Sequence, residues 1–66
     1  MKFHEFTEDE FKLIKQKAML NKEMSEIFEL KILGYTEYQI AMKVHLGERT
    51  VSRRVKELKK KIKRVL

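Results

Sequence analysis

Apolar side chains recur along this chain at spacings of three and four residues, which is the periodicity of a helix with one buried face. The clearest run lies in the last third of the chain and consists of Val51, Val55, Leu58, Ile62 and Val65. On a helical projection this run stays within about 40° of Val51, because each residue advances by about 100°. β-Branched residues never alternate with polar residues over the length of a strand. The pattern therefore predicts an all-α fold, a small four-helix domain.

The first helix is predicted at about residues 8–20. Thr7 and Glu10 have the spacing of a capping box, in which each side chain accepts a hydrogen bond from the other residue's backbone N–H. Phe6 and Phe11 flank this start at the positions of a hydrophobic staple. These signals predict a helix that begins directly after Thr7.

A second helix is predicted at about residues 22–33. Asn21 has a side chain suited to cap its first turn, and Gly34 is suited to end it because glycine adopts the left-handed conformation at little cost. No proline or glycine separates Thr7 from Leu33, however. A single long helix over this stretch is therefore the alternative.

The third and fourth helices are predicted at about residues 37–44 and 48–65. Thr36 and Gln39 repeat the capping-box spacing at the start of the third helix. Residues 45–47 form a short break, after which no proline or glycine interrupts the chain. A short helix, a three-residue turn and a longer helix have the layout of a helix-turn-helix.

Charge is distributed unevenly over the 66 residues, whose formal net charge is +6. Residues 1–33 carry 6 Lys and 7 Asp or Glu, whereas residues 34–66 carry 10 Lys or Arg and 3 Glu. On the last predicted helix, Arg49, Arg53, Lys56 and Lys60 lie about 140–200° from Val51, opposite the apolar stripe. Such asymmetry indicates a polyanionic partner, either nucleic acid or an anionic membrane, unless the basic face is simply solvated.

Several classes of function are not expected from this composition. The chain has no cysteine, and its histidines, His4 and His45, are too far apart to form a metal site by themselves, so no cofactor or metal is expected. No Ser/His/Asp set or glycine-rich phosphate loop indicates an enzyme. No apolar run approaches the length of a membrane span or the apolar stretch of a signal peptide, so the cytoplasm is the expected compartment. The length of the chain predicts one domain over residues 1–66.

The second half of the chain resembles a known family of transcription proteins. The residues that carry the likeness are Gly34-Tyr35-Thr36-x-x-Gln39-Ile40-Ala41-x-x-Val44-x-Leu46-x-x-x-Thr50-Val51-x-x-Arg54-Val55. This stretch is similar to the helix-turn-helix of sigma factor region 4 and of LuxR/GerE-type regulators. The likeness extends over about residues 20–58. It implies sequence-specific binding of double-stranded DNA by a stand-alone transcriptional regulator, with a recognition helix that starts at Glu48.

Two residues depart from the family pattern. His45 stands where the family usually has a glycine with positive φ, and histidine adopts that conformation with some strain. Gly47 stands where the family usually has a serine or threonine cap, and glycine is a weaker cap. Both departures indicate a divergent member.

The resemblance, together with the helical projection, predicts the DNA-contacting residues. Bases in the major groove would be met by Glu48, Arg49, Ser52 and Arg53, with Lys56 near the edge. Backbone phosphates would be met by Thr36, Tyr38, Lys43, Arg54 and Lys59. An arginine can bind the O6 and N7 edge of guanine, whereas Glu48 is more suited to stabilise the helix N-terminus. Tyr38 is equally well explained as an ordinary half-exposed tyrosine.

A second class of partner is a protein. The end of the apolar stripe, formed by Leu58, Ile62, Val65 and Leu66, offers an interface for a homodimer if the last helix projects from the domain. The alternative is that the N-terminal helix folds back and covers Leu58 and Ile62. A related hypothesis is an adaptor that binds RNA polymerase or another regulator. A membrane-surface helix is disfavoured, because tryptophan is absent and a helix-turn-helix core explains the apolar face.

Overall fold

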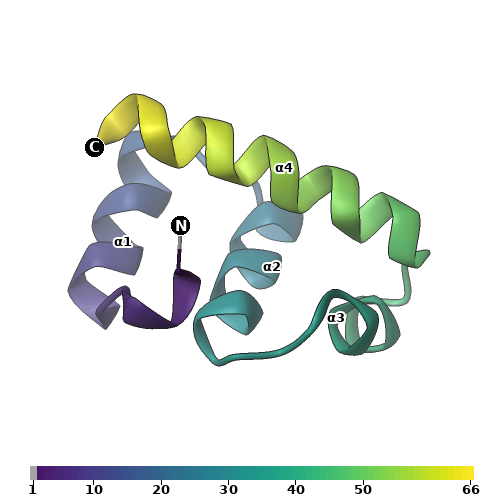
Figure 1. Cartoon of the computed structure of the whole chain (residues 1–66). Helices are drawn as coiled ribbons and strands as arrows, with labels where there is room; N and C mark the ends of the chain where they lie inside the picture. The colour runs from purple at the N-terminus through teal and green to yellow at the C-terminus, as the bar shows by residue number, and fades with distance from the viewer. Residues whose placement is uncertain (1) are drawn as a thin grey trace.

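Five helical segments account for the regular structure of residues 2–66, the part of the chain that the computed structural model describes. They are the 3₁₀ turn η1 (Phe3–Glu5) and the helices α1 (Glu8–Lys17), α2 (Lys22–Ile32), α3 (Glu37–Val44) and α4 (Glu48–Val65) (Figure 1). The predicted all-α fold with four α-helices is confirmed. The alternative of one long helix from Thr7 to Leu33 is wrong, since α1 and α2 are separate.

Side-chain caps start the first three helices. Glu10 N–H donates to Thr7 Oγ1 at 3.1 Å, and Thr7 N–H donates to Glu10 Oε1 at 2.9 Å. The same reciprocal pair joins Thr36 and Gln39, at 3.1 and 3.0 Å. Asn21 Oδ1 accepts a backbone N–H of α2 at 2.8 Å. All three predicted caps are therefore confirmed, and each bond joins residues three apart in sequence.

The same three helices end in left-handed residues. These residues are Met19 (φ 52°), Gly34 (φ 95°) and His45 (φ 59°). After each one, a backbone N–H reaches back five residues at 3.1 Å: Leu20 to Lys15, Tyr35 to Leu30 and Leu46 to Ala41. This bond satisfies a carbonyl that the ended helix leaves free. The predicted end of the first helix at residue 20 is too late, because Met19 takes the role usually given to glycine.

A single core lies between the helices and is centred on Phe28 of α2. The rings of Phe3, Phe6 and Phe11 surround that of Phe28, with centroids 5.9, 5.7 and 5.1 Å from it. Tilted contacts of this kind suit the charge distribution of aromatic rings. The buried aromatic cluster therefore ties η1 and α1 to α2.

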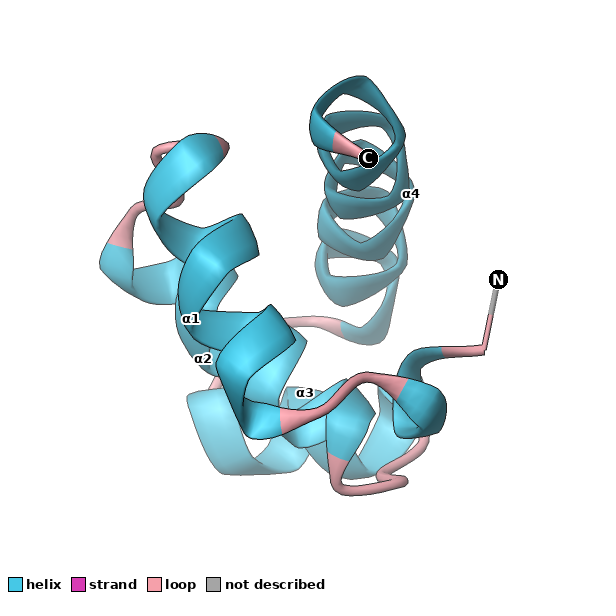
Figure 2. Ribbon diagram, turned by 90° about the vertical axis from the view of Figure 1, so that its left-hand side faces the viewer, coloured by secondary structure: helices cyan, strands magenta, loops and turns pink. Residues whose placement is uncertain are grey.

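Helix α4 spans the whole domain and contributes much of its core. In Figure 1 it runs across the top of the molecule, and it contacts α1, α2 and α3. Figure 2 looks nearly along its axis and shows α1 beside it and α3 beneath it. The buried residues of α4 are Val51, Val55, Leu58 and Ile62, as the apolar stripe predicted. None of the helices described here is long and apolar enough to cross a membrane.

Candidate nucleic-acid interface

Helix α4 presents two opposite faces. Its apolar face is buried against the other helices, whereas Arg49, Arg53, Lys56 and Lys60 are exposed. Residues of the two faces follow one another along the sequence at helical spacing and lie on opposite sides of the helix. Burial of the apolar face therefore leaves the basic face in solvent. The fold therefore holds a row of cations in solvent on a rigid element.

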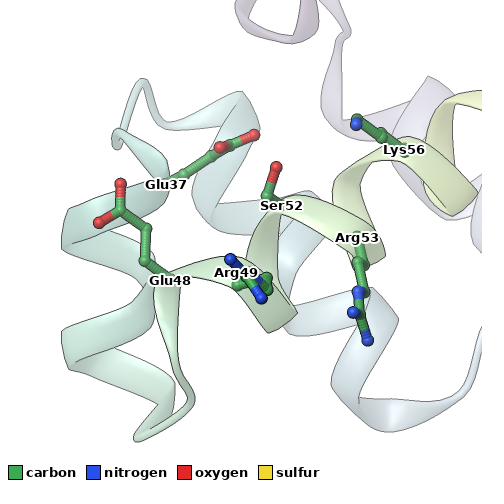
Figure 3. A pocket seen from close by; sticks show the side chains of 6 residues that line it. All are labelled: Glu37, Glu48, Arg49, Ser52, Arg53 and Lys56. Carbon is green, nitrogen blue, oxygen red and sulfur yellow. The ribbon is translucent and has the colours of Figure 1, made fainter.

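Five residues at the start of α4 and one residue of α3 surround a shallow depression of about 560 Å³. Its lining is Glu37, Glu48, Arg49, Ser52, Arg53 and Lys56 (Figure 3). The depression thus brings together every residue predicted to meet DNA bases. In the part of the chain that the structure describes, Arg49, Arg53 and Lys56 form no ion pair. Their positive charges are available to an anionic partner.

Two carboxylates in this lining sit at helix N-termini. Glu37 lies in the first turn of α3 and Glu48 in the first turn of α4. A carboxylate at this end of a helix interacts favourably with the helix dipole and the free N–H groups. Gly47 supplies no side-chain cap to α4, so Glu48 is the acidic group nearest that end. This geometry supports a stabilising role for Glu48.

The five predicted phosphate contacts do not form one group. Tyr38 is exposed, and Thr36 uses its side chain to cap α3. Lys43 lies over the Tyr35 ring, 5.1 Å from its centroid, and lines a different depression together with carboxylates of α2. Lys59 lines a depression that shares Glu37 with the one at the start of α4.

Arg54 has protein partners, which its position in the sequence pattern did not indicate. Its Nε donates to Glu23 Oε1 at 2.6 Å, and its Nη1 lies 3.4 Å from Glu57 Oε1. The hydrogen bond and the charge of Glu23 raise the pKa of Arg54 above its ordinary value. Arg54 therefore braces α4 against α2, and a phosphate would have to compete with Glu23 for it.

The predicted dimer surface needs correction. Leu58 and Ile62 are 0% exposed, because α1 and α2 pack against this part of α4 within the same chain. They belong to the core, as the fold-back alternative anticipated, and are not available to a second copy. Val65 is partly buried, and only Leu66, 76% exposed, keeps the predicted exposure.

Three further basic residues, which were not expected from the sequence, lie beside the depression at the start of α4. Lys2, His4 and Lys31 line a second depression together with Lys59 and Glu37. The first two flank Phe3, whose burial fixes the N-terminal segment against α2. Together with Lys59 of α4, these residues come from three separate parts of the chain, so no local spacing could have indicated the group.

Neither the family models nor the curated proteins nor the solved structures gave a match to this chain. Within residues 2–66, no group of three or more His, Asp or Glu side chains is arranged to hold a metal ion. The exposed face of α4 and its surroundings are therefore the features of the molecule that bear on function.

Proposed function

We propose that this protein binds double-stranded DNA with α4 in the major groove and acts as a stand-alone transcriptional regulator. The observation that carries the proposal is the clustering of Arg49, Ser52, Arg53 and Lys56 on the solvent side of a helix whose other side is core. Such a helix presents long cationic side chains on a rigid support. Rigid presentation favours specific contacts with base edges over loose attraction to phosphates.

The dimensions of α4 suit this mode of binding. An α-helix with its side chains is about 10–12 Å wide, and the major groove is about 12 Å wide. Arg49 and Arg53 lie one turn apart, so both can follow the groove floor. Either can bind guanine through O6 and N7, and Ser52 can accept or donate at a neighbouring base or phosphate. Lys56, a turn further on, reaches the groove edge.

The turn between α3 and α4 supports a helix-turn-helix interpretation. His45 has φ 59° and ψ 39°, the left-handed conformation that the resembling families reach with glycine at this position. Ile40 and Ala41 of α3 are buried, as are Val51 and Val55 of α4. Packing of these residues fixes the angle between α3 and α4. Thr36 and Tyr38, at the exposed start of α3, are suited to meet the neighbouring phosphates.

The competing proposal of a protein adaptor is less well supported. It requires the apolar stripe of α4 to be offered to RNA polymerase, another regulator or a second copy, yet the centre of that stripe is core. Leu66 and part of Val65 would be the only remaining contribution. DNA binding by a monomer uses the surface that the fold actually exposes.

Selection of bound sequences from a random pool of duplex DNA tests the proposal. We expect enrichment of a short motif containing guanine, with an affinity that falls steeply as salt is raised. A motif without two-fold symmetry would agree with a monomer. Binding without any enrichment would contradict base reading by Arg49 and Arg53, and no binding at all would contradict the proposed function.

A further inference from the structure

We propose that the N-terminal turn η1 is part of the DNA-binding surface, where Lys2 and His4 join Lys31 and Lys59 to hold neighbouring phosphates of the DNA backbone. This inference rests on the proposed function and adds a second contact region to it. The side chains of these three lysines and one histidine come from the N-terminal segment, α2 and α4, and line one depression of about 310 Å³. They meet only because the chain end folds back onto α2.

The position of this depression relates it to the base-reading residues. Glu37, at the N-terminal end of α3, lines both depressions, so the two adjoin. On α4, Lys56 borders the first depression, and Lys59, three residues further, borders the second. A DNA strand that leaves the groove edge at Lys56 therefore meets Lys59 next, with the N-terminal turn beside it.

The N-terminal turn is held in place by packing rather than by its charges. Phe3 is buried, and its ring contacts that of Phe28 with centroids 5.9 Å apart. Phe6 N–H donates to the Phe3 carbonyl at 3.1 Å, which closes the turn. Lys31 Nζ lies 5.6 Å from the centroid of the Phe3 ring, so α2 contributes a cation directly next to the turn. Lys2 and His4 are consequently exposed at a fixed place.

The charge balance of the second depression favours an anion. Three lysines and one histidine face a single carboxylate, that of Glu37. Among residues 2–66, these lysines form no ion pair with Asp or Glu. Lysine binds phosphate as a point charge on a flexible stem, which suits backbone contacts that do not depend on sequence. The site should therefore add affinity to all duplexes equally.

Salt dependence of DNA binding tests the site. For B-DNA, log K falls with log salt with a slope of about −0.9 for each neutralised phosphate. We expect the double variant Lys2→Gln/Lys59→Gln to flatten the slope by about 1.8 and to weaken binding to all sequences alike. The control Lys17→Gln/Lys22→Gln removes the same charge from residues outside both depressions and should leave the slope unchanged. The variant Lys2→Arg/Lys59→Arg should restore the slope.

A second variant isolates the N-terminal turn, because Lys59 alone could account for part of that result. Lys2→Gln/His4→Gln leaves α4 intact and should flatten the slope by about 0.9, because it removes the charge of Lys2. An unchanged slope in this variant would overturn the inference, while enrichment of a DNA motif by the original chain would leave the proposed function standing. Failure of the original chain to bind duplex DNA would overturn both. Thermal melting of each variant verifies the fold.

Discussion

Adjacent arginines on α4 have different surroundings although their chemistry is the same. Arg53 is exposed in the depression at the start of α4, whereas Arg54 is bound to Glu23 of α2. One residue step rotates the side chain by about 100° around the helix, which moves it from the solvent face to the side of the core. Their different positions around the helix therefore give the two arginines different partners.

The first prediction concerns Arg53. Replacing it with alanine should weaken binding to the selected motif by about 1–3 kcal/mol and relax the base preference at one position, because a guanine contact is lost. Titration of the variant against the motif and single-base changes of it measures both effects. Lys60→Ala is the matched control, since Lys60 is exposed on the same stripe outside the depression. Equal weakening on every sequence would make Arg53 a phosphate contact instead.

The second prediction concerns the left-handed residue that ends α1. Met19 is 85% exposed and has φ 52°, a conformation that costs a non-glycine residue about 1–2 kcal/mol. Met19→Gly should raise the free energy of unfolding by about 0.5–1 kcal/mol, after allowance for the greater freedom of glycine in the unfolded chain. Thermal melting measures this. Met42→Gly, an exposed change inside α3, should instead lower stability by about 1 kcal/mol. A lower melting temperature for Met19→Gly would contradict the strain argument.

At the scale of the helices, α4 is the element that α1, α2 and α3 all contact. Its residues are divided between the buried core and the exposed cations. The third prediction tests this division. Ile62→Ala should lower the free energy of unfolding by about 2–5 kcal/mol, because it leaves a cavity in the core.

Aspartate substitutions distinguish core from interface at the same end of α4. Ile62→Asp should abolish folding, since an unpaired carboxylate would be buried. Leu66→Asp should leave the melting temperature nearly unchanged, because Leu66 is exposed. Circular dichroism and sedimentation together report folding and mass. If the original chain is a dimer and Ile62→Asp is a folded monomer, Ile62 lies in a dimer interface and not in the core.

The sequence predicted those elements whose causes are local. Thr7, Asn21 and Thr36 each bond to a group three residues away, so their spacing reveals them. The left-handed Met19 was missed, because methionine has no intrinsic preference for that conformation. The Arg54–Glu23 pair was also missed, since its partners are 31 residues apart and only packing brings them together. The second cationic depression was missed for the same reason, because only packing brings its lining residues together.

At the scale of the whole molecule, the charges are segregated. Helix α4 carries 9 Lys or Arg and 2 Glu, whereas α2 carries 2 Lys and 3 Glu. A duplex approaching the molecule would therefore be drawn to the α4 side, and more strongly at low salt. Glu37 is an exception, because its carboxylate lines both cationic depressions.

The fourth prediction uses that exception. Glu37→Gln removes a negative charge next to the proposed phosphate path and should tighten DNA binding by up to about 1 kcal/mol at low salt, with less effect as salt screens the charges. Binding titrations at several salt concentrations measure this. Glu26→Gln makes the same charge change on α2, outside both depressions, and serves as the control. Weaker binding of Glu37→Gln would show that its carboxylate helps to hold the DNA or the helix start.

Helix α4 supplies both core residues and the proposed DNA-binding surface. Binding of DNA would therefore be coupled to folding and to resistance against proteolysis. An unfolded chain has no helix to present, so a duplex bound as proposed holds the folded form by mass action. At a duplex concentration of 100 times Kd, this linkage adds about 2.7 kcal/mol to the free energy of unfolding. Proteases that cleave the transiently opened chain would then remove free molecules faster than bound ones. The number of surviving molecules would follow the number of occupied sites.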